Sequence, residues 1–142
     1  MQPLYRLTYF STPKTDIAES DIRAILKSAR GFNSKSNITG FLTFHKSCFL
    51  QVLEGSREAL SETFLRLGHD PRHHGIVLMG FDAIDQRAFA AWSMGYLPLT
   101  NYKDERIRRY TASGHELKPT DLSVQGAVSL LLEFAKEAAA QP

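Results

Sequence analysis

The sequence predicts an α+β domain in which helices pack on both faces of one mixed β-sheet. Short runs of alternating apolar and polar residues indicate strands, and two runs with apolar residues at helical spacing lie between them. The predicted elements follow the order β-α-β-β-α-β with one extra strand, which is the split β-α-β arrangement of ferredoxin-like folds. We therefore expect a five-stranded mixed sheet with two helices on one face and C-terminal helices on the other.

The first strand and the first helix are predicted over residues 4–11 and 20–30. Side chains alternate along the strand, which places Tyr9 on the face that should be covered by the helices. In the helix, Ser20 can act as the N-cap and apolar residues recur at positions i, i+3, i+4 and i+7. Gly31 is typical of a C-terminal cap, so we expect the helix to end there.

A hairpin, a second helix and a fourth strand follow. The hairpin is predicted over residues 38–45 and 48–54. Ser56 can cap a helix that ends near Gly68. The run 76–81 is apolar almost throughout, which favours a strand that is buried on both faces.

The rest of the chain supplies the last strand and a cover for the sheet. The fifth strand is predicted over residues 92–97, and a short helical segment over 104–110. An amphipathic stripe over 124–138 can cover the apolar face that the first two helices leave open. We therefore expect a core of residues 1–98 and a C-terminal helical extension of residues 99–142 that covers the sheet.

Composition excludes several classes of protein. The chain has 142 residues, a formal net charge of +2 and no long basic run, so its charge gives no reason to expect a nucleic-acid partner. The single cysteine, Cys48, excludes an intrachain disulfide, and no Cys/His spacing indicates a metal site. No secretory signal is visible, and the most apolar stretch is too short to span a bilayer. We expect a cytoplasmic protein without membrane contact.

One polar residue interrupts the inner face of the second hairpin strand. Gln51 lies between Phe49 and Leu53, so its amide points toward the expected core. A buried amide without a partner costs roughly 1–3 kcal/mol, so a polar group must meet it. Tyr9 is another polar group on an inner strand face. A hydrogen bond between Tyr9 and Gln51 alone would satisfy both; a polar ligand beside them is the other interpretation.

The run Asp70-Pro71-Arg72-His73-His74 follows the second helix. Adjacent histidines on a strand point in opposite directions, so His73 and His74 are not expected to chelate one metal. A solvated loop is one interpretation of this run, and an anion site made by Arg72 and His73 is the other.

Three further residues bear on a ligand site. Asn33 comes after the predicted helix end, where asparagine is usually a turn or cap residue. Trp92 and Met94 should share one face of the last strand. Cys48 lies on the opposite strand face from Gln51, so we expect it to be a small buried residue that does not reach a ligand above the inner face.

Taken together, these residues resemble the BLUF family, the sensors of blue light using FAD. The resemblance covers residues 4–97, and several motifs occur in the family's order and at family-like spacing. The matching segments are Tyr5-Arg6-Leu7-Thr8-Tyr9, Asn33, Asn37-Ile38-Thr39-Gly40, Phe49-Leu50-Gln51-Val52-Leu53-Glu54-Gly55, Asp70-Pro71-Arg72-His73-His74 and Trp92-Ser93-Met94. The remaining tail is similar to that of the family's short single-domain members.

The resemblance implies a role for each matching residue. Tyr9 would be the photoactive tyrosine, and Gln51 the glutamine between it and the flavin. Trp92 and Met94 would be the mobile positions that report the flavin's state. The cofactor would be FAD, with FMN or riboflavin as alternatives. The residues implied to bind it are Tyr9, Ile25, Asn33, Phe49, Gln51, Leu53, Arg66, Asp70, Arg72 and His73. The residue before Asn33 is Phe32, where many relatives are polar.

The implied function is a blue-light photoreceptor and not an enzyme. Light would rearrange the hydrogen bonds between tyrosine, glutamine and a non-covalent flavin, and the change would be relayed in trans to a separate, unidentified partner protein; a homo-oligomer is compatible with this. Two other functions fit the predicted fold. One is an acylphosphatase-like enzyme that holds phosphate with an arginine and an asparagine. The other is an RNA-recognition sheet, which needs exposed aromatic residues on the sheet face.

Overall fold

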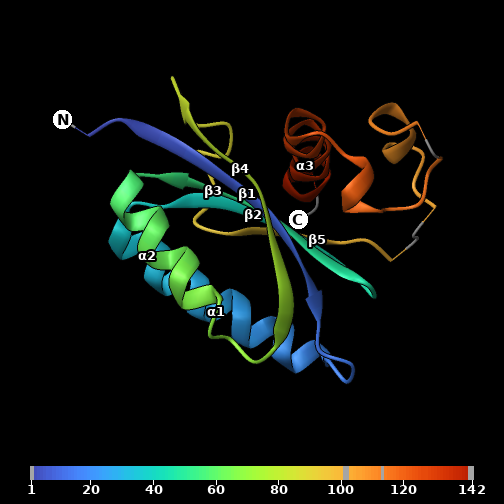
Figure 1. Ribbon diagram of the computed structural model, residues 1–142, viewed down its shortest axis with the longest axis horizontal. Helices are drawn as coiled ribbons and strands as arrows, with labels where there is room; N and C mark the ends of the chain where they lie inside the picture. Colours follow the sequence, from blue (N-terminus) through green and yellow to red (C-terminus); the bar gives the residue numbers. More distant parts are fainter. Residues whose placement is uncertain (1, 101–102, 113, 141–142) are drawn as a thin grey trace.

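One five-stranded sheet separates two helices from a third in the computed structural model (Figure 1). The structure describes residues 2–100, 103–112 and 114–140. The strands are β1 (Leu4–Pro13), β2 (Thr39–His45), β3 (Cys48–Gly55), β4 (His73–Ile84) and β5 (Gly95–Pro98). They lie in the order β4-β1-β3-β2-β5, and every neighbouring pair is antiparallel except β2 and β5, which are parallel. This confirms the predicted α+β, ferredoxin-like mixed sheet.

The helices are α1 (Glu19–Ser36), α2 (Arg57–Leu67) and α3 (Val124–Ala140). The prediction that the first helix ends at Gly31 is wrong, because α1 continues for more than one further turn. Asn33 keeps the helical spacing of the buried face, and the helix ends at Asn37, whose φ of 55° lies in the left-handed region. Gly31 is exposed, and a β-carbon at this position would meet no atom within 4 Å, so the helix accommodates it without using it as a cap.

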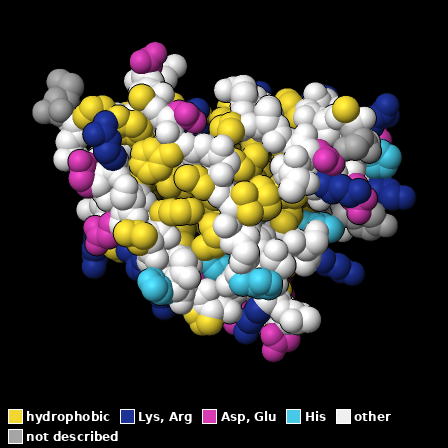
Figure 2. Space-filling view, in the orientation of Figure 1, with side chains coloured by type: hydrophobic (Ala, Val, Ile, Leu, Met, Phe, Trp, Pro, Cys, Tyr) yellow, Lys and Arg dark blue, Asp and Glu magenta, His cyan; other side chains and the backbone are white. Residues whose placement is uncertain are grey.

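The fourth strand is longer than predicted, and the prediction that it is buried on both faces is wrong. The strand has 12 residues and pairs only with β1, so it forms one edge of the sheet. Val77 and Leu78 are about half exposed, in contrast to the burial on both faces that the apolar run indicated. Hydrophobic side chains gather in the middle of the face shown in Figure 2, where β4 and β1 cross in Figure 1. An apolar run does not distinguish an edge strand from a central one.

The last strand begins later than predicted, and this changes where two residues point. Residues 92–94 form a bend, and β5 starts at Gly95. Contrary to the prediction, Trp92 and Met94 therefore do not share a face. Trp92 packs edge-on against Phe41 on the α3 side of the sheet, whereas Met94 is buried on the side of α1 and α2.

The C-terminal extension contains one α-helix within the described residues, not several. The helix predicted over 104–110 is a short 3₁₀ turn (Ile107–Arg109), and a second 3₁₀ turn follows (Pro119–Asp121). Residues 101–102, 113 and 141–142 of the predicted extension lie outside the described residues. None of the helices in the described ranges is long and apolar enough to cross a membrane.

The sheet divides the buried residues into two cores. The α3-side core joins the sheet to the C-terminal segment and includes Phe41, Cys48, Leu50, Val52, Leu131 and Phe134. The pocket-side core lies under α1 and α2 and includes Leu7, Tyr9, Ile22, Leu26, Phe49, Leu53 and Met94. Alternate residues of β3 therefore serve different cores, and Cys48 lies on the side away from Gln51, as predicted. Burial raises the pKa of the Cys48 thiol to about 12.

Candidate functional site

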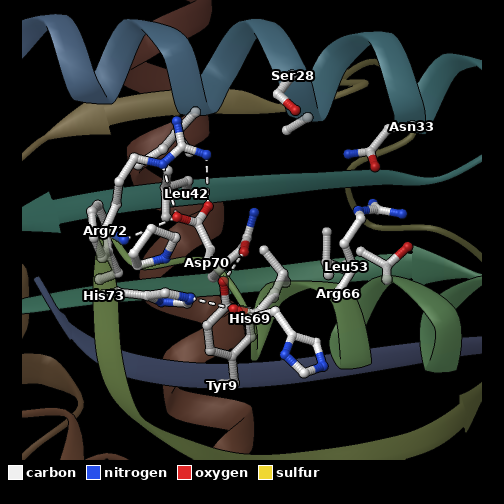
Figure 3. A pocket seen from close by; sticks show the side chains of 17 residues that line it. Tyr9, Ser28, Asn33, Leu42, Leu53, Arg66, His69, Asp70, Arg72 and His73 are labelled. Atoms are coloured by element: carbon white, nitrogen blue, oxygen red, sulfur yellow. Dashed lines mark hydrogen bonds and ion pairs between the residues drawn. The ribbon is translucent and has the colours of Figure 1, made fainter.

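A cavity of about 480 Å³ lies between α1 and α2 on the pocket side of the sheet (Figure 3). This volume falls in the range of small-molecule and cofactor sites. The lining residues come from β1, α1, β2, β3, α2, the loop before β4 and the first residue of β4. They are Tyr9, Ile25, Ser28, Ala29, Asn33, Leu42, Phe49, Gln51, Leu53, Thr63, Arg66, Leu67, His69, Asp70, Pro71, Arg72 and His73. The structure therefore brings together all ten residues that the resemblance assigned to the cofactor.

Tyr9 and Gln51 form the polar centre of the cavity floor. They are direct partners in the antiparallel register of β1 and β3, and the Tyr9 hydroxyl donates a hydrogen bond to Gln51 Oε1. Burial raises the pKa of Tyr9 well above its ordinary value, and the negative charge of Asp70 raises it further. Tyr9 is therefore a neutral phenol that holds its proton toward Gln51.

The other end of the Gln51 amide meets Met94. Gln51 Nε2 lies 3.3 Å from Met94 Sδ and donates to this sulfur. A thioether is a weak acceptor, so this bond is easily exchanged for a better one. Because an amide has a donor and an acceptor of nearly equal shape, rotation of Gln51 exchanges its partners with little change in volume.

The side-chain amide of Asn33 has its nitrogen hydrogen-bonded and its oxygen available. It is buried in α1, and its Nδ2 donates to the Ser93 carbonyl at 2.7 Å. Asn33 Oδ1 accepts no hydrogen bond from any residue that the structure describes, and the residue lines the cavity. It can therefore accept a hydrogen bond from a ring N–H of a ligand.

Asp70 and Arg72 make a rigid ion pair at the cavity wall (Figure 3). Arg72 Nε donates to Asp70 Oδ1 at 2.9 Å and Nη2 donates to Oδ2 at 2.6 Å, while the Arg72 backbone N–H also donates to Oδ1. The hydrogen bond from Arg72 holds the pKa of Asp70 below its ordinary value, and the same bond raises the pKa of Arg72. The arrangement presents guanidinium N–H groups whose orientation is fixed.

His73 is held in place by a hydrogen bond at each of its two ring nitrogens. One ring nitrogen, Nε2, lies 2.7 Å from the Leu67 carbonyl, so it carries the proton and donates. Nδ1 then accepts from the Ser11 hydroxyl, also at 2.7 Å. The ring packs edge-on against Tyr9 and Phe49, so it fixes the wall behind Tyr9.

Arg66 lies in a different part of the cavity from Arg72. Its guanidinium carbon lies 3.3 Å from the centre of the Phe32 ring, which is a cation–π contact. In Figure 3, Arg66 lies near Asn33, whereas Asp70, Arg72 and His73 group together. Phe32 thus holds Arg66 at the cavity, although it is not itself a lining residue.

Several lining residues were missed from the sequence, among them Ser28, Leu42, Thr63 and His69. Leu42 could have been found from strand pairing, because it is the direct partner of Gln51 on β2. Ser28 lies one helical turn after Ile25, on the same face of α1. Thr63 lies one helical turn before Arg66, on the inner face of α2. His69 carries no such signal, because it follows the end of α2.

Comparison with known proteins decides the family. Residues 4–95 match the family described as "Sensors of blue-light using FAD", which is well over half of the chain. The chain belongs to the BLUF family. The matched residues include every lining residue of the cavity and the bend that carries Met94.

Two curated relatives illustrate the range of this family. The chain is 34% identical over 92 residues to the photoactivated adenylate cyclase subunit beta of Euglena longa, and it covers 11% of that protein. It is 33% identical over 104 residues to the blue light- and temperature-regulated antirepressor BluF of Escherichia coli, of which it covers 26%. The alignments cover 64% and 73% of this chain, so it spans only a small part of these relatives.

Two solved structures match nearly the whole BLUF chain. The photo-activated state of BlsA superposes with a TM-score of 0.82 at 27% identity, covering 98% of this chain and 96% of the other. The dark state of BlrB, a BLUF protein, superposes with a TM-score of 0.76 at 30% identity, covering 99% of both chains. The arrangement of core and C-terminal helix is therefore shared with proteins of the same size.

The cavity fits the FAD of the BLUF family. Its aliphatic and aromatic lining, which includes Ile25, Phe49 and Leu53, suits the flat faces of a flavin ring. The available Asn33 Oδ1 and the exchangeable Gln51 amide suit the ring edge, which carries both donors and acceptors. The fixed guanidinium of Arg72 suits an anionic chain.

Proposed function

We propose that this chain senses blue light through the buried hydrogen-bond chain Tyr9–Gln51–Met94. The observation that carries the proposal is that one amide is bonded on one side to a neutral phenol and on the other to a weak sulfur acceptor, at the floor of a cofactor-sized cavity. Such an amide can exchange its partners, which is what a switch requires.

The site residues divide into groups with different tasks. Ile25, Phe49 and Leu53 form the slot for the ring, and Asn33 accepts from its polar edge. Asp70, Arg72 and His73 meet the ribityl and phosphate end of FAD, Arg72 directly and the other two by holding the wall in place. The resemblance assigns Arg66 to the same end, but Arg66 lies nearer to Asn33 (Figure 3). The resemblance assigns Trp92 and Met94 together as mobile positions, but Trp92 packs against Phe41 outside the cavity, and Met94 is the residue of this bend that contacts Gln51.

The protein residues then carry out the switch. When bound, the flavin supplies a strong oxidant in its excited state. Tyr9 would supply an electron to that oxidant and then its hydroxyl proton, for which Gln51 Oε1 is the hydrogen-bonded acceptor, and both would return to Tyr9 afterwards. A rotated or tautomerised Gln51 would donate a hydrogen bond toward the ring edge of the bound cofactor instead of to Met94 Sδ. Such an added hydrogen bond would shift the absorption to the red.

We further propose that residues 1–98 act as the photosensor core, that residues 99–142 relay its state, and that the output is a separate partner protein regulated in trans. The E. coli relative is named an antirepressor and the Euglena relative a cyclase subunit, so similar modules serve different outputs. On this account the chain itself catalyses no reaction.

The other functions considered have less support. An acylphosphatase-like site needs an arginine and an asparagine that converge on one phosphate, but Arg72 groups with Asp70 and His73, whereas Asn33 lies apart from them near Arg66 (Figure 3). An RNA-recognition sheet needs an open aromatic face, and α3 packs on the face opposite the cavity (Figure 1).

Paired variants test the proposed function. Tyr9→Phe removes the donated proton and Gln51→Leu removes the exchangeable amide, so each should bind flavin and lose the red-shifted product. Tyr5→Phe is the matched control, since Tyr5 lies on the same strand and its hydroxyl bonds Arg57 at the surface. A normal photocycle in Tyr9→Phe or Gln51→Leu would exclude the role assigned to that residue.

A further inference from the structure

Three consecutive carbonyl groups of the bend before β5 are held by other elements. The Trp92 carbonyl accepts from the Gly40 N–H of β2 at 2.9 Å. The Ser93 carbonyl accepts from Asn33 Nδ2 at 2.7 Å, and the Met94 carbonyl accepts from Arg30 Nε at 3.0 Å. Two of these donors are side chains of α1, and together they fix the backbone that carries Met94.

Arg30 differs from Asn33 in its relation to the cavity. Asn33 lines the cavity and has a second task there, whereas Arg30 is an exposed residue of α1 outside the lining. Arg30 can therefore influence the site through its hydrogen bond to the Met94 carbonyl. The neighbouring Gln51–Met94 contact depends on where the backbone holds the Met94 side chain.

We propose that Arg30 is a positioning residue of the light switch, which holds Met94 so that its sulfur faces the Gln51 amide. This inference rests on the proposed function. Arg30 acts through the backbone carbonyl of residue 94, so its effect does not depend on contact with the flavin. Because water competes for an exposed guanidinium, the bond can be broken and re-formed each time the bend moves.

The position of the Arg30 bond sets the direction of its effect on the photocycle. In this proposal the bond is made in both states and is released while the bend moves, so it contributes to the barrier in each direction. Removing it lowers that barrier in both directions and accelerates recovery in the dark. A single hydrogen bond of ordinary net strength corresponds to roughly a 2- to 10-fold change in rate.

The experiment compares Arg30→Ala and Arg30→Lys with a control on the same helix. Arg23→Ala is the control, because Arg23 is 69% exposed in its side chain and its ion pair in the described residues is with Glu19 at 4.0 Å. Each holoprotein is illuminated with blue light, and the decay of the red-shifted absorption is followed in the dark. Fluorescence of Trp92, the only tryptophan in the sequence, reports the bend in the same samples.

We expect recovery to be roughly 2- to 10-fold faster in Arg30→Ala, partly restored in Arg30→Lys and unchanged in Arg23→Ala. The thermal midpoints of Arg30→Ala and Arg23→Ala should agree, which separates positioning from a loss of stability. If Arg30→Ala shows the same red shift as the wild type but recovers at an unchanged or slower rate, this inference alone is overturned. A wild-type protein without any light-induced red shift overturns the proposed function and, with it, this inference.

Discussion

The two faces of the sheet satisfy their buried polar groups in different ways. On the α3 side, the fully buried Glu54 carboxylate accepts two hydrogen bonds from Arg6, one from Thr39 and two from the backbone of residues 88 and 89. On the pocket side, Gln51 donates to a weak sulfur acceptor and Asn33 leaves an oxygen available. The Glu54 carboxylate on the first face is satisfied within the chain, whereas the amides on the second face keep hydrogen-bonding capacity that a ligand can use.

A similar contrast appears in two ion pairs of the same local form. Arg72 folds back on Asp70, and Arg106 folds back on Asp104 with nearly the same three hydrogen bonds. Arg106 also pairs with Glu137 of α3 and stacks on Phe134, so its partners belong to the chain. Arg72 faces the cavity. The same motif therefore supports packing on one side and ligand binding on the other.

The largest expected effect is on stability, from the α3 side. Phe134→Ala removes a fully buried ring of the α3-side core and should lower the free energy of unfolding by about 3–5 kcal/mol. The measurement is urea unfolding, with Leu65→Ala as the control because Leu65 is 70% exposed. A loss below about 1 kcal/mol for Phe134→Ala would contradict the full burial of this ring in the α3-side core.

The two ion pairs give the next prediction. Arg72→Ala should weaken FAD binding by roughly tenfold or more, because a charge-assisted hydrogen bond to the anionic chain is lost. Arg106→Ala should leave the affinity unchanged. Titration of the flavin-free protein with FAD, followed by flavin fluorescence, measures both. Equal losses of affinity in the two variants would remove the distinction between the faces.

Acid should break the Asp70–Arg72 pair. The hydrogen bond from Arg72 lowers the pKa of Asp70 below 3.8 in the folded protein, so the pair stabilises the fold above the ordinary pKa. That contribution is lost as the pH falls through the lowered value. The difference in unfolding free energy between wild type and Asp70→Asn should therefore be constant above about pH 5 and shrink below about pH 4. A difference that shrinks instead as the pH rises would refute the assigned cause.

The smallest expected effect concerns Thr8, a buried polar residue on the α3 side whose hydroxyl is not satisfied in the part of the chain that the structure describes. Among the described residues, the Thr8 hydroxyl is the buried side-chain group that has no hydrogen-bond partner. Thr8→Val should be neutral or should stabilise the fold by up to about 1 kcal/mol, because an unsatisfied hydroxyl is replaced by a methyl group. Thr43→Val is the matched control, since the buried Thr43 hydroxyl donates to the Leu97 carbonyl at 2.8 Å. It should cost about 1 kcal/mol, and a reversed order would contradict the hydrogen-bond assignment.

Alternation along single strands predicted the part of the site that depends on strand register. Tyr9 and Gln51 break the apolar pattern of inner strand faces, and the structure pairs them directly. The end of α1 could not be predicted, because Gly31 has a typical cap identity but an exposed position within the helix. The positions of Trp92 and Met94 could not be predicted either. They depend on a bend that is held by Gly40, Asn33 and Arg30, far away in the sequence.

The central claim is that the pocket side responds to light by exchanging hydrogen bonds around a bound flavin. The most direct test is the absorption spectrum of the purified protein before and after blue light. We expect a small red shift of the flavin bands without bleaching, which reverses in the dark, and release of the flavin on denaturation. An unchanged spectrum, or a bleached spectrum of the kind given by a thiol adduct, would contradict the account.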